Sequence, residues 1–242
     1  MSSTNRDPSI HSENYETPWW AVNRLLEEVY FPPGLWLEPC AGNGRIIQAV
    51  NADRPGQIQW CAVEPRHECG PSLAQQEGIL KICHEDFLTW NARKVAEKLG
   101  VRVQSQRYFD AIITNPPFSK ALDILSKCLT IATFVAILQR INWLGGGSNN
   151  GKNDFLRGCM PNVYPVPDRI HYLQNGEFPR YPPGHKLAGR LMPGDSIEYC
   201  WYVWGPPDVR FQESGIIRNL LSTPVEERTT MELLPYPGYI EA

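Results

Sequence analysis

The sequence predicts an α/β fold in which a mostly parallel sheet carries helices on both faces. From about residue 18 to residue 140, short apolar segments typical of buried strands alternate with segments of helical spacing. The chain has 242 residues, of which 42% are hydrophobic and 20% charged. This length and composition suit one domain with a sizeable core.

The first elements follow a polar N-terminal segment. Residues 1–13 contain no apolar run, and we expect them to form a flexible arm. Thr17 and Pro18 are typical of a helix start, with Thr17 as the N-cap and Pro18 in the first helical position. Apolar residues at helical spacing continue this helix to residue 30. The elements expected next are a strand at 35–37, a helix beginning at 45–50 and a strand at 58–63.

The alternation continues through the middle of the chain. Each expected strand is a short apolar run bounded by turn residues, as is typical of a strand buried on both faces. Gly100 marks the end of one of the helices. The expected helices are 73–77, 90–99 and 120–129, and the expected strands are 80–83, 109–114 and 133–138.

The chain changes character after residue 144. More than half of its 22 prolines follow residue 160, so we expect a loop-rich insert over 145–195. Two strands are still expected, at 169–173 and 197–204, with 174–195 as a long excursion between them. The predicted organisation is therefore the N-terminal arm, one α/β domain over 14–205 and a C-terminal extension over 206–242.

Composition excludes several classes of protein. The seven cysteines are an odd number and form no Cys-x-x-Cys pair, which argues against a disulfide framework and a metal site. No apolar run approaches the ~18 residues of a membrane span, and the N-terminus lacks a secretory signal, so we expect a cytoplasmic protein. The formal net charge is −3, yet residues 139–190 hold seven basic and three acidic residues. That stretch is either a solvated surface or a nucleic-acid contact.

A glycine-containing turn, Glu38-Pro39-Cys40-Ala41-Gly42-Asn43-Gly44, joins the first strand to the next helix. Ligands of open parallel sheets bind outside the carboxyl ends of the strands. Gly42 and Gly44 lack Cβ atoms, so the backbone can turn tightly and approach a ligand. Glu38 is placed to accept from an ammonium group. The turn lacks the third glycine of G-x-G-x-x-G, which disfavours a dinucleotide; a plain strand–helix connection is the alternative.

Two further carboxylates follow successive strands. Glu64 ends the second strand, where an acid can accept from two ribose hydroxyls. Asp86 follows the third strand, where it can accept from an adenine amino group, and Phe87 can pack beside that ring. Either acid taken alone also fits an exposed loop charge.

The sharpest motif is Asn115-Pro116-Pro117-Phe118, which directly follows the fourth strand. The nitrogen lone pair of an aryl amine is delocalised into the ring, so such an amine is a poor nucleophile. The Asn115 side-chain oxygen and the Pro116 carbonyl, accepting from the amine hydrogens, would localise that pair and aim it at a methyl donor. The prolines hold the turn rigid and Phe118 offers a stacking face. The alternative is a rigid strand-ending turn.

Together these motifs resemble the S-adenosylmethionine-dependent DNA N6-adenine methyltransferases, especially small phage-type enzymes with a gamma-like motif order. The resemblance implies a Rossmann-like methyltransferase fold, a seven-stranded sheet with an antiparallel last strand, and S-adenosylmethionine as cofactor. It implies methylation of a flipped adenine in duplex DNA, in restriction–modification or a related setting. It makes Asn115, Pro116, Pro117 and Phe118 the catalytic residues. The implied cofactor-binding residues are Tyr15, Thr17, Pro18, Glu38, Pro39, Cys40, Ala41, Gly42, Asn43, Gly44, Glu64, Asp86, Phe87 and Asn115.

The polymer is less closely specified than the type of nitrogen. The tetrapeptide also fits enzymes that methylate protein glutamine or RNA, and N4 of cytosine in DNA is a further variant. A catalytically inactive binding module is a third hypothesis. The sequence leaves the oligomeric state open. The expected substrate contacts are Phe118, Arg140, Asn142, Trp143, Lys152, Arg180, Lys186 and Arg190.

Overall fold

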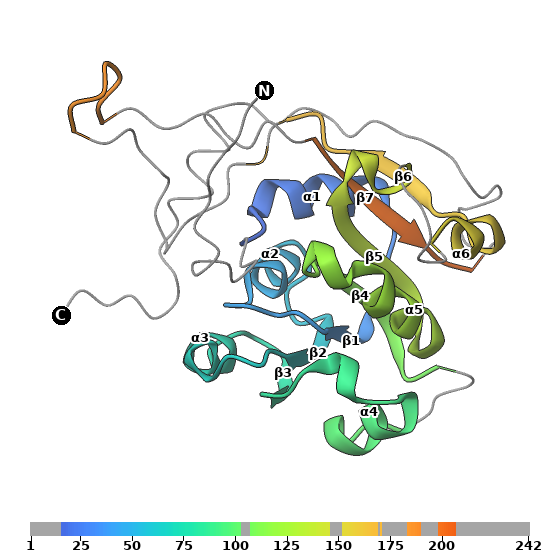
Figure 1. The fold of residues 1–242 in the computed structure, drawn as a ribbon. Coiled ribbons are helices and arrows are strands. Elements are labelled where there is room, and N and C mark those ends of the chain that lie inside the picture. Colours follow the sequence, from blue (N-terminus) through green and yellow to red (C-terminus); the bar gives the residue numbers. More distant parts are fainter. Residues whose placement is uncertain are drawn as a thin grey trace.

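A single seven-stranded sheet organises the computed structural model of the chain (Figure 1). The structure describes residues 16–102, 107–145, 152–168, 170, 183–189 and 198–206. The spatial order of the strands is β3-β2-β1-β4-β5-β7-β6. Their bounds are β1 Gly34–Glu38, β2 Ile58–Val63, β3 Ile79–Cys83, β4 Phe109–Thr114, β5 Ala132–Arg140, β6 Asn162–Pro165 and β7 Tyr199–Trp204.

Strands β1 to β5 are parallel, and β7 runs antiparallel to both of its neighbours, β5 and β6. In register, Leu37 of β1 lies opposite Cys61 of β2 on one side and Ile112 of β4 on the other. The chain therefore builds outward from β1 in one direction and then returns to β4 beside it. Such a reversal of strand order is where open α/β sheets bind ligands.

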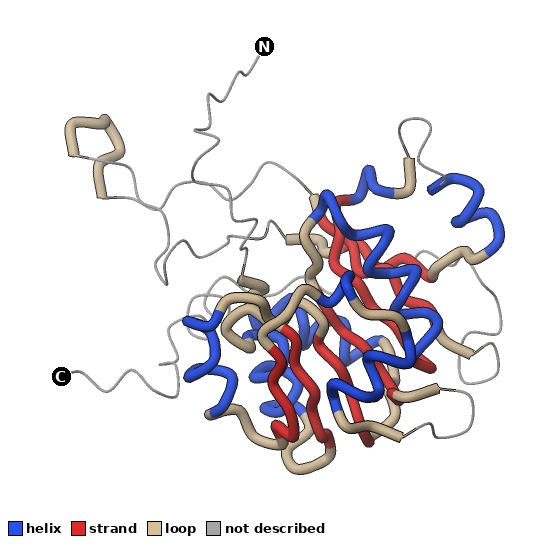
Figure 2. The backbone as a smooth tube through the Cα atoms, turned by 60° about the horizontal axis from the view of Figure 1, so that its bottom comes forward, coloured by secondary structure: helices blue, strands red, loops and turns tan. Residues whose placement is uncertain are grey.

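Helices cover both faces of the sheet (Figure 2). Helices α1, α2 and α3 pack on one face with the cluster that contains Trp36 and Trp60 of the strands. Helices α4 and α5 pack on the other face with the cluster that contains Leu37 and Ile112. Successive strand residues thus enter opposite cores, as the two-residue strand period requires. The helix bounds are α1 Trp19–Glu28, α2 Arg45–Asp53, α3 Gly70–Ala74, α4 Ala92–Leu99, α5 Ala121–Ile131 and α6 Lys152–Gly158.

The predicted fold class is confirmed, and two predicted strands, 58–63 and 109–114, agree with β2 and β4 to the residue. Both lie inside the sheet with helices on each side, so their sequences are nearly continuous apolar runs with clear ends. No helix in the described part of the chain is long and apolar enough to cross a membrane.

Three local predictions are wrong. Thr17 is not the N-cap of the first helix: Pro18 holds that position with extended φ −69° and ψ 145°, and α1 begins at Trp19. The helix expected at 73–77 lies earlier, at Gly70–Ala74, because Pro71 starts it. The helix expected at 90–99 begins only at Ala92, since Asn91 caps it by accepting from the Lys94 amide at 2.8 Å.

The strand expected at 169–173 lies outside the described residues except for Ile170, which is in no strand. The strand β6, Asn162–Pro165, was not predicted. Its prolines hide the signal, but β6 is at the edge of the sheet, where a missing N–H is tolerated. Helix α6 went unpredicted. The predicted arm at 1–13 lies outside the described residues, as does most of the C-terminal extension.

Candidate active site

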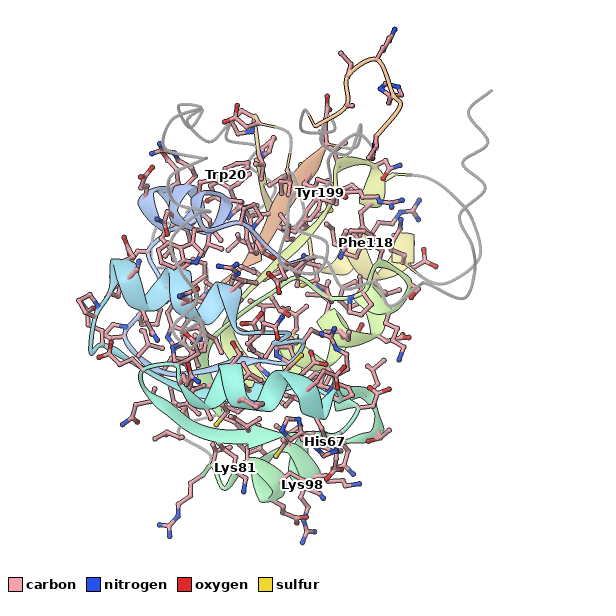
Figure 3. All side chains as sticks on the ribbon, turned by 90° about the vertical axis from the view of Figure 1, so that its left-hand side faces the viewer. Trp20, His67, Lys81, Lys98, Phe118 and Tyr199 are labelled. Carbon is pink, nitrogen blue, oxygen red and sulfur yellow. The ribbon has the colours of Figure 1, made fainter. Side chains whose placement is uncertain are left out.

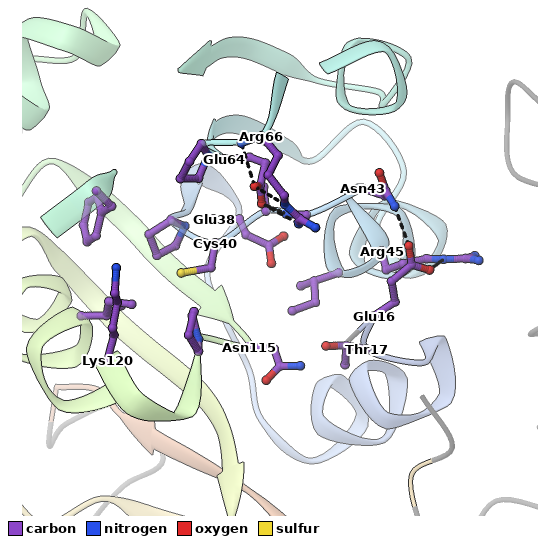
Figure 4. Close-up of a pocket in the computed structure, with 18 of the residues that line it drawn as sticks. Glu16, Thr17, Glu38, Cys40, Asn43, Arg45, Glu64, Arg66, Asn115 and Lys120 are labelled. Atoms are coloured by element: carbon purple, nitrogen blue, oxygen red, sulfur yellow. Dashed lines mark hydrogen bonds and ion pairs between the residues drawn. The ribbon is translucent and has the colours of Figure 1, made fainter. Parts of the chain in front are cut away.

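The carboxyl ends of β1 and β4 open into a cavity of about 260 Å³ at the point where the strand order reverses (Figure 4). Four chain segments that follow β1, β2, β3 and β4 reach it. Of the predicted site residues, those lining it are Thr17, Glu38, Pro39, Cys40, Ala41, Gly42, Asn43, Glu64, Asp86, Phe87, Asn115 and Pro117. Pro18, Gly44, Pro116 and Phe118 are outside this lining, and Tyr15 lies outside the described residues.

Glu38, the last residue of β1, carries a carboxylate with an unused acceptor. The residue is 2% exposed, and its Oε2 has no hydrogen-bond partner among the described residues. The backbone N–H of Ile47, in the first turn of α2, donates to the carboxylate. Burial, aided by the nearby Glu64 carboxylate, raises the pKa of Glu38 well above its usual value. A buried acceptor without a partner is unfavourable in the ligand-free protein, and it suits a cationic donor.

The turn after β1 is held by backbone hydrogen bonds and by glycine conformations. The amide of Ala41 donates to the Val63 carbonyl at 3.0 Å, and the amide of Gly42 donates to Glu64 Oε2 at 2.8 Å. Gly44 has φ +84°, in the left-handed region. A Cβ there would lie 3.1 Å from Leu73 Cδ2 and 3.2 Å from Gln76 Cγ. The last glycine of the turn therefore permits the close packing of α3 against the start of α2.

Replacing Gly44 with alanine should destabilise the protein by about 2–3 kcal/mol, because the left-handed backbone and the crowding against α3 both oppose a Cβ. The control is Gly56→Ala. Gly56 has a similar φ of +70°, but no atom of the described residues lies within 4 Å of the added Cβ, so this variant should lose only about 1 kcal/mol. Urea unfolding measures both. Equal losses would mean that crowding at Gly44 is irrelevant.

Glu16 connects the segment before α1 to the turn after β1. This contact was not predicted from the sequence. Glu16 Oε1 accepts from Asn43 Nδ2 at 2.6 Å, and Oε2 pairs with Arg45 Nε at 3.2 Å (Figure 4). The side chains of Glu16 and Arg45 are each 10% exposed. Thr17, which is buried, lies beside them in the cavity lining. The predicted cofactor-binding residues Tyr15, Thr17 and Pro18 belong to this segment, but the residue that anchors it to the turn after β1 is Glu16.

Glu64, at the end of β2, is already paired. Arg66 Nε lies 2.7 Å from Glu64 Oε1, and the Arg66 guanidinium covers the carboxylate (Figure 4). Burial alone would raise the pKa of Glu64, but the hydrogen bonds from Arg66 outweigh it and lower that pKa. The carboxylate is therefore ionised and available only to donors that compete with Arg66.

Asp86 and Phe87 follow β3 and also line the cavity. Asp86 Oδ1 accepts from the Leu88 amide at 2.9 Å, and Oδ2 pairs with Lys120 Nζ at 3.2 Å. The Leu88 amide is the main cause that lowers the pKa of Asp86, with Lys120 contributing. Phe87 is 3% exposed and packs edge-on against Trp90. Asp86 keeps an exposed edge, whereas Phe87 supplies an apolar wall.

The tetrapeptide after β4 separates two environments. Asn115 and Pro117 line the cavity. The Pro116 carbonyl turns toward buried Gln139 of β5, whose Nε2 donates to it at 3.3 Å. A carbonyl has two lone pairs, so Pro116 retains one acceptor position. Gln139 is a second residue that sequence reasoning missed.

Phe118 does not line the cavity and packs against Tyr199 and Arg140. The ring centroids of Phe118 and Tyr199 are 6.0 Å apart (Figure 3). The guanidinium carbon of Arg140 lies 4.7 Å from the centroid of the Phe118 ring. The Nε of Arg140 is buried without a hydrogen-bond partner among the described residues. The aromatic residue expected to stack on a base is thus covered by an arginine in this state.

The other predicted substrate contacts are dispersed. Asn142 is exposed in the turn after β5, and Trp143 packs on Tyr202 with ring centroids 5.3 Å apart. Lys152 donates to the carbonyls of Trp143 and Gly145, so its ammonium holds that turn. Lys186 is exposed on the 183–189 loop. Arg180 and Arg190 lie outside the described residues.

The described residues contain no group of three His, Cys, Asp or Glu side chains that could hold a metal ion. Glu38, Glu64 and Asp86 all line the cavity, and Asn115 lies across it from Glu38 (Figure 4).

Comparison with known proteins identifies the fold. No protein-family model matches the sequence, and no curated protein matches it. The methyltransferase subunit of a type I restriction-modification system from Streptococcus thermophilus superposes with a TM-score of 0.52 at 11% identity, covering 90% of this chain and 52% of that one. A proposed RNA methyltransferase from Pyrococcus horikoshii gives 0.52 at 16% identity, covering 83% and 90%.

A third similar structure is the modification subunit of a proposed type I restriction enzyme from Vibrio vulnificus, with a TM-score of 0.50 at 12% identity, covering 81% of this chain and 45% of that one. The chain thus spans about half the length of the two restriction-system subunits. Likeness at this identity establishes the fold: a Rossmann-like methyltransferase fold with an antiparallel seventh strand.

Proposed function

We propose that this chain transfers a methyl group from S-adenosylmethionine to an exocyclic amino group, with N6 of adenine in DNA as the target. One observation carries the proposal. Asn115, at the tip of β4, lines the same cavity as the buried carboxylate of Glu38 at the tip of β1, whose Oε2 has no hydrogen-bond partner among the described residues. A cation-accepting carboxylate and an amide able to orient an amine therefore face the same cavity at the reversal point of the sheet.

The residues of the cavity fit the proposed cofactor group by group. Glu38 Oε2 would accept from the ammonium of the methionine end, which supplies the partner that this buried oxygen lacks. Glu64 would accept from the ribose and Asp86 from the adenine amino group, with Phe87 packed beside the ring. When bound, S-adenosylmethionine supplies a methyl group on a sulfonium, which is a good leaving group.

The work of the chain in the reaction is orientation of the nucleophile. The Asn115 side-chain oxygen and the second lone pair of the Pro116 carbonyl would accept from the two hydrogens of the target amine. Gln139 holds the Pro116 carbonyl at 3.3 Å. Fixed acceptors that need no rearrangement during the reaction are an effective way to stabilise a transition state.

Two observations support DNA as the substrate: the similar structures and the surroundings of Arg140. Two of the similar structures are subunits of restriction systems, and one is a proposed RNA methyltransferase. Arg140, next to Phe118, has a buried Nε donor with no partner among the described residues, which suits an acceptor on an incoming nucleotide. A base turned out of its helix would displace the Arg140 guanidinium to reach the Phe118 ring.

The test is transfer of tritium from labelled S-adenosylmethionine to duplex DNA, RNA and protein in parallel reactions. We expect label in DNA, recovered as N6-methyladenine after digestion to nucleosides. Label found only in RNA or only in protein would show that the proposed substrate is wrong and that the proposed methyl transfer is right. No label in any polymer, together with no binding of the cofactor by calorimetry, would overturn the proposal.

A further inference from the structure

The Glu64 carboxylate accepts four hydrogen bonds within the described chain. Its Oε1 accepts from the Arg66 amide at 3.1 Å and from Arg66 Nε at 2.7 Å. Its Oε2 accepts from the Gly42 amide at 2.8 Å and from Arg66 Nη2 at 3.2 Å. An ionised carboxylate has about four acceptor positions. The group expected to hold a ribose therefore has no acceptor position left.

The four donors differ in how easily they can leave. The amides of Gly42 and Arg66 belong to backbone turns that β1 and β2 fix in place. The Nε and Nη2 donors belong to one long side chain that is 29% exposed. It lies across the cavity side of Glu64 and is itself part of the cavity lining (Figure 4). Two adjacent positions can thus be vacated together by one side-chain rotation, with the backbone unmoved.

We infer that the Arg66 guanidinium occupies the place of the ribose diol and must leave Glu64 when a nucleoside binds. This inference rests on the proposed function. Two hydroxyl donors of a vicinal diol would replace the two guanidinium donors, one on each carboxylate oxygen. Arg66 is then a residue that sets affinity for the ribose: every bond gained by the diol is offset by one lost from Arg66.

The exchange has a consequence for turnover. S-adenosylhomocysteine, the product of methyl transfer, carries the same ribose as the substrate. Return of Arg66 to Glu64 as the diol leaves would favour release of that product and shorten its residence. Removing the guanidinium should therefore strengthen product binding mainly through a slower dissociation rate.

The inference is tested by measuring the affinity of S-adenosylhomocysteine and of its 2′,3′-dideoxy analogue for the wild type, Arg66→Gln and Arg66→Ala. Solvent weakens the partly exposed ion pair between Arg66 and Glu64, so its loss should have a modest effect. We expect each variant to bind the natural ligand about tenfold more tightly. The dideoxy analogue cannot compete for Glu64, so its affinity should change less than about twofold. Arg66→Gln retains much of the side-chain stem and guards against misfolding of Arg66→Ala.

Arg93→Ala is the matched control. Arg93 forms an exposed ion pair with Glu97 at 2.9 Å on α4, away from the cavity lining, and its loss should change neither affinity. Unchanged or weaker binding of the natural ligand to both Arg66 variants would overturn the inference, as would equal tightening of both ligands. In those outcomes wild-type binding and methyl transfer remain, so the proposed function stands. If the wild type binds neither ligand, both fall.

Discussion

Replacing Asn115 with alanine should slow methyl transfer about 100- to 1000-fold, the usual effect of losing one preorganised hydrogen-bonding group at a reacting centre. The variant loses the acceptor that orients the target amine. Cofactor affinity should change less than about threefold, because Glu38, Glu64 and Asp86 carry the proposed contacts to the cofactor. Single-turnover transfer of tritium measures the first quantity, and calorimetry with S-adenosylmethionine measures the second.

Asn91→Ala is the control for this experiment. Asn91 caps α4 by accepting from the Lys94 amide at 2.8 Å and does not line the cavity. Its loss should cost about 1 kcal/mol of stability and leave the transfer rate unchanged. If Asn115→Ala transferred methyl groups at the wild-type rate, Asn115 would have no place in the mechanism. If it lost cofactor affinity and rate in parallel, its role would be in binding.

The elements predicted most accurately from the sequence are those with the least ambiguous surroundings. Strands β2 and β4 are buried between helices, so apolar residues alone define them and their ends fall where polar or turn residues resume. Strand β6 is not recognisable from its sequence in this way, because Pro161 precedes it and Pro165 ends it. Only its edge position, a property of the assembled sheet, makes that sequence a strand.

The site divides in the same way between local and long-range causes. Residues at strand ends were predictable, because parallel strands bring their carboxyl ends to one edge. Glu16 and Gln139 were not, since they act on partners 27 and 23 residues away. Gln139 did leave a trace, as the one amide in the largely apolar strand Ala132–Arg140. Arg66 lies two residues from Glu64, but sequence alone does not show that its side chain folds back.

Glu38→Gln should change stability and ligand affinity in opposite directions. Without ligand at neutral pH, the variant should be more stable than the wild type by about 1–3 kcal/mol, because it removes the charge of a buried carboxylate whose Oε2 lacks a partner among the described residues. It should bind S-adenosylmethionine about 10- to 100-fold more weakly, since a neutral amide replaces the charged acceptor of the ammonium. Urea unfolding and calorimetry measure the two effects.

The pH dependence gives this prediction its sign. Burial and then the Glu64 carboxylate raise the pKa of Glu38 in the folded protein above the usual value of 4.5. Below that value Glu38 is protonated in both states, so wild type and variant should be equally stable. As pH rises from there through the raised pKa, the unfolded chain releases the proton first and the wild type loses stability. The higher stability of Glu38→Gln should therefore appear only at pH values above the usual pKa of 4.5.

Glu85→Gln is the control that removes the same charge elsewhere. Glu85 is a partly exposed acid after β3 that does not line the cavity, and hydrogen bonds from Lys98 and Trp90 lower its pKa. Its loss should give no gain in stability and no change in affinity for the cofactor. If Glu38→Gln also left the affinity unchanged, Glu38 would not hold the ammonium. A variant less stable than the wild type at neutral pH would show that the Ile47 amide needs an ionised acceptor there.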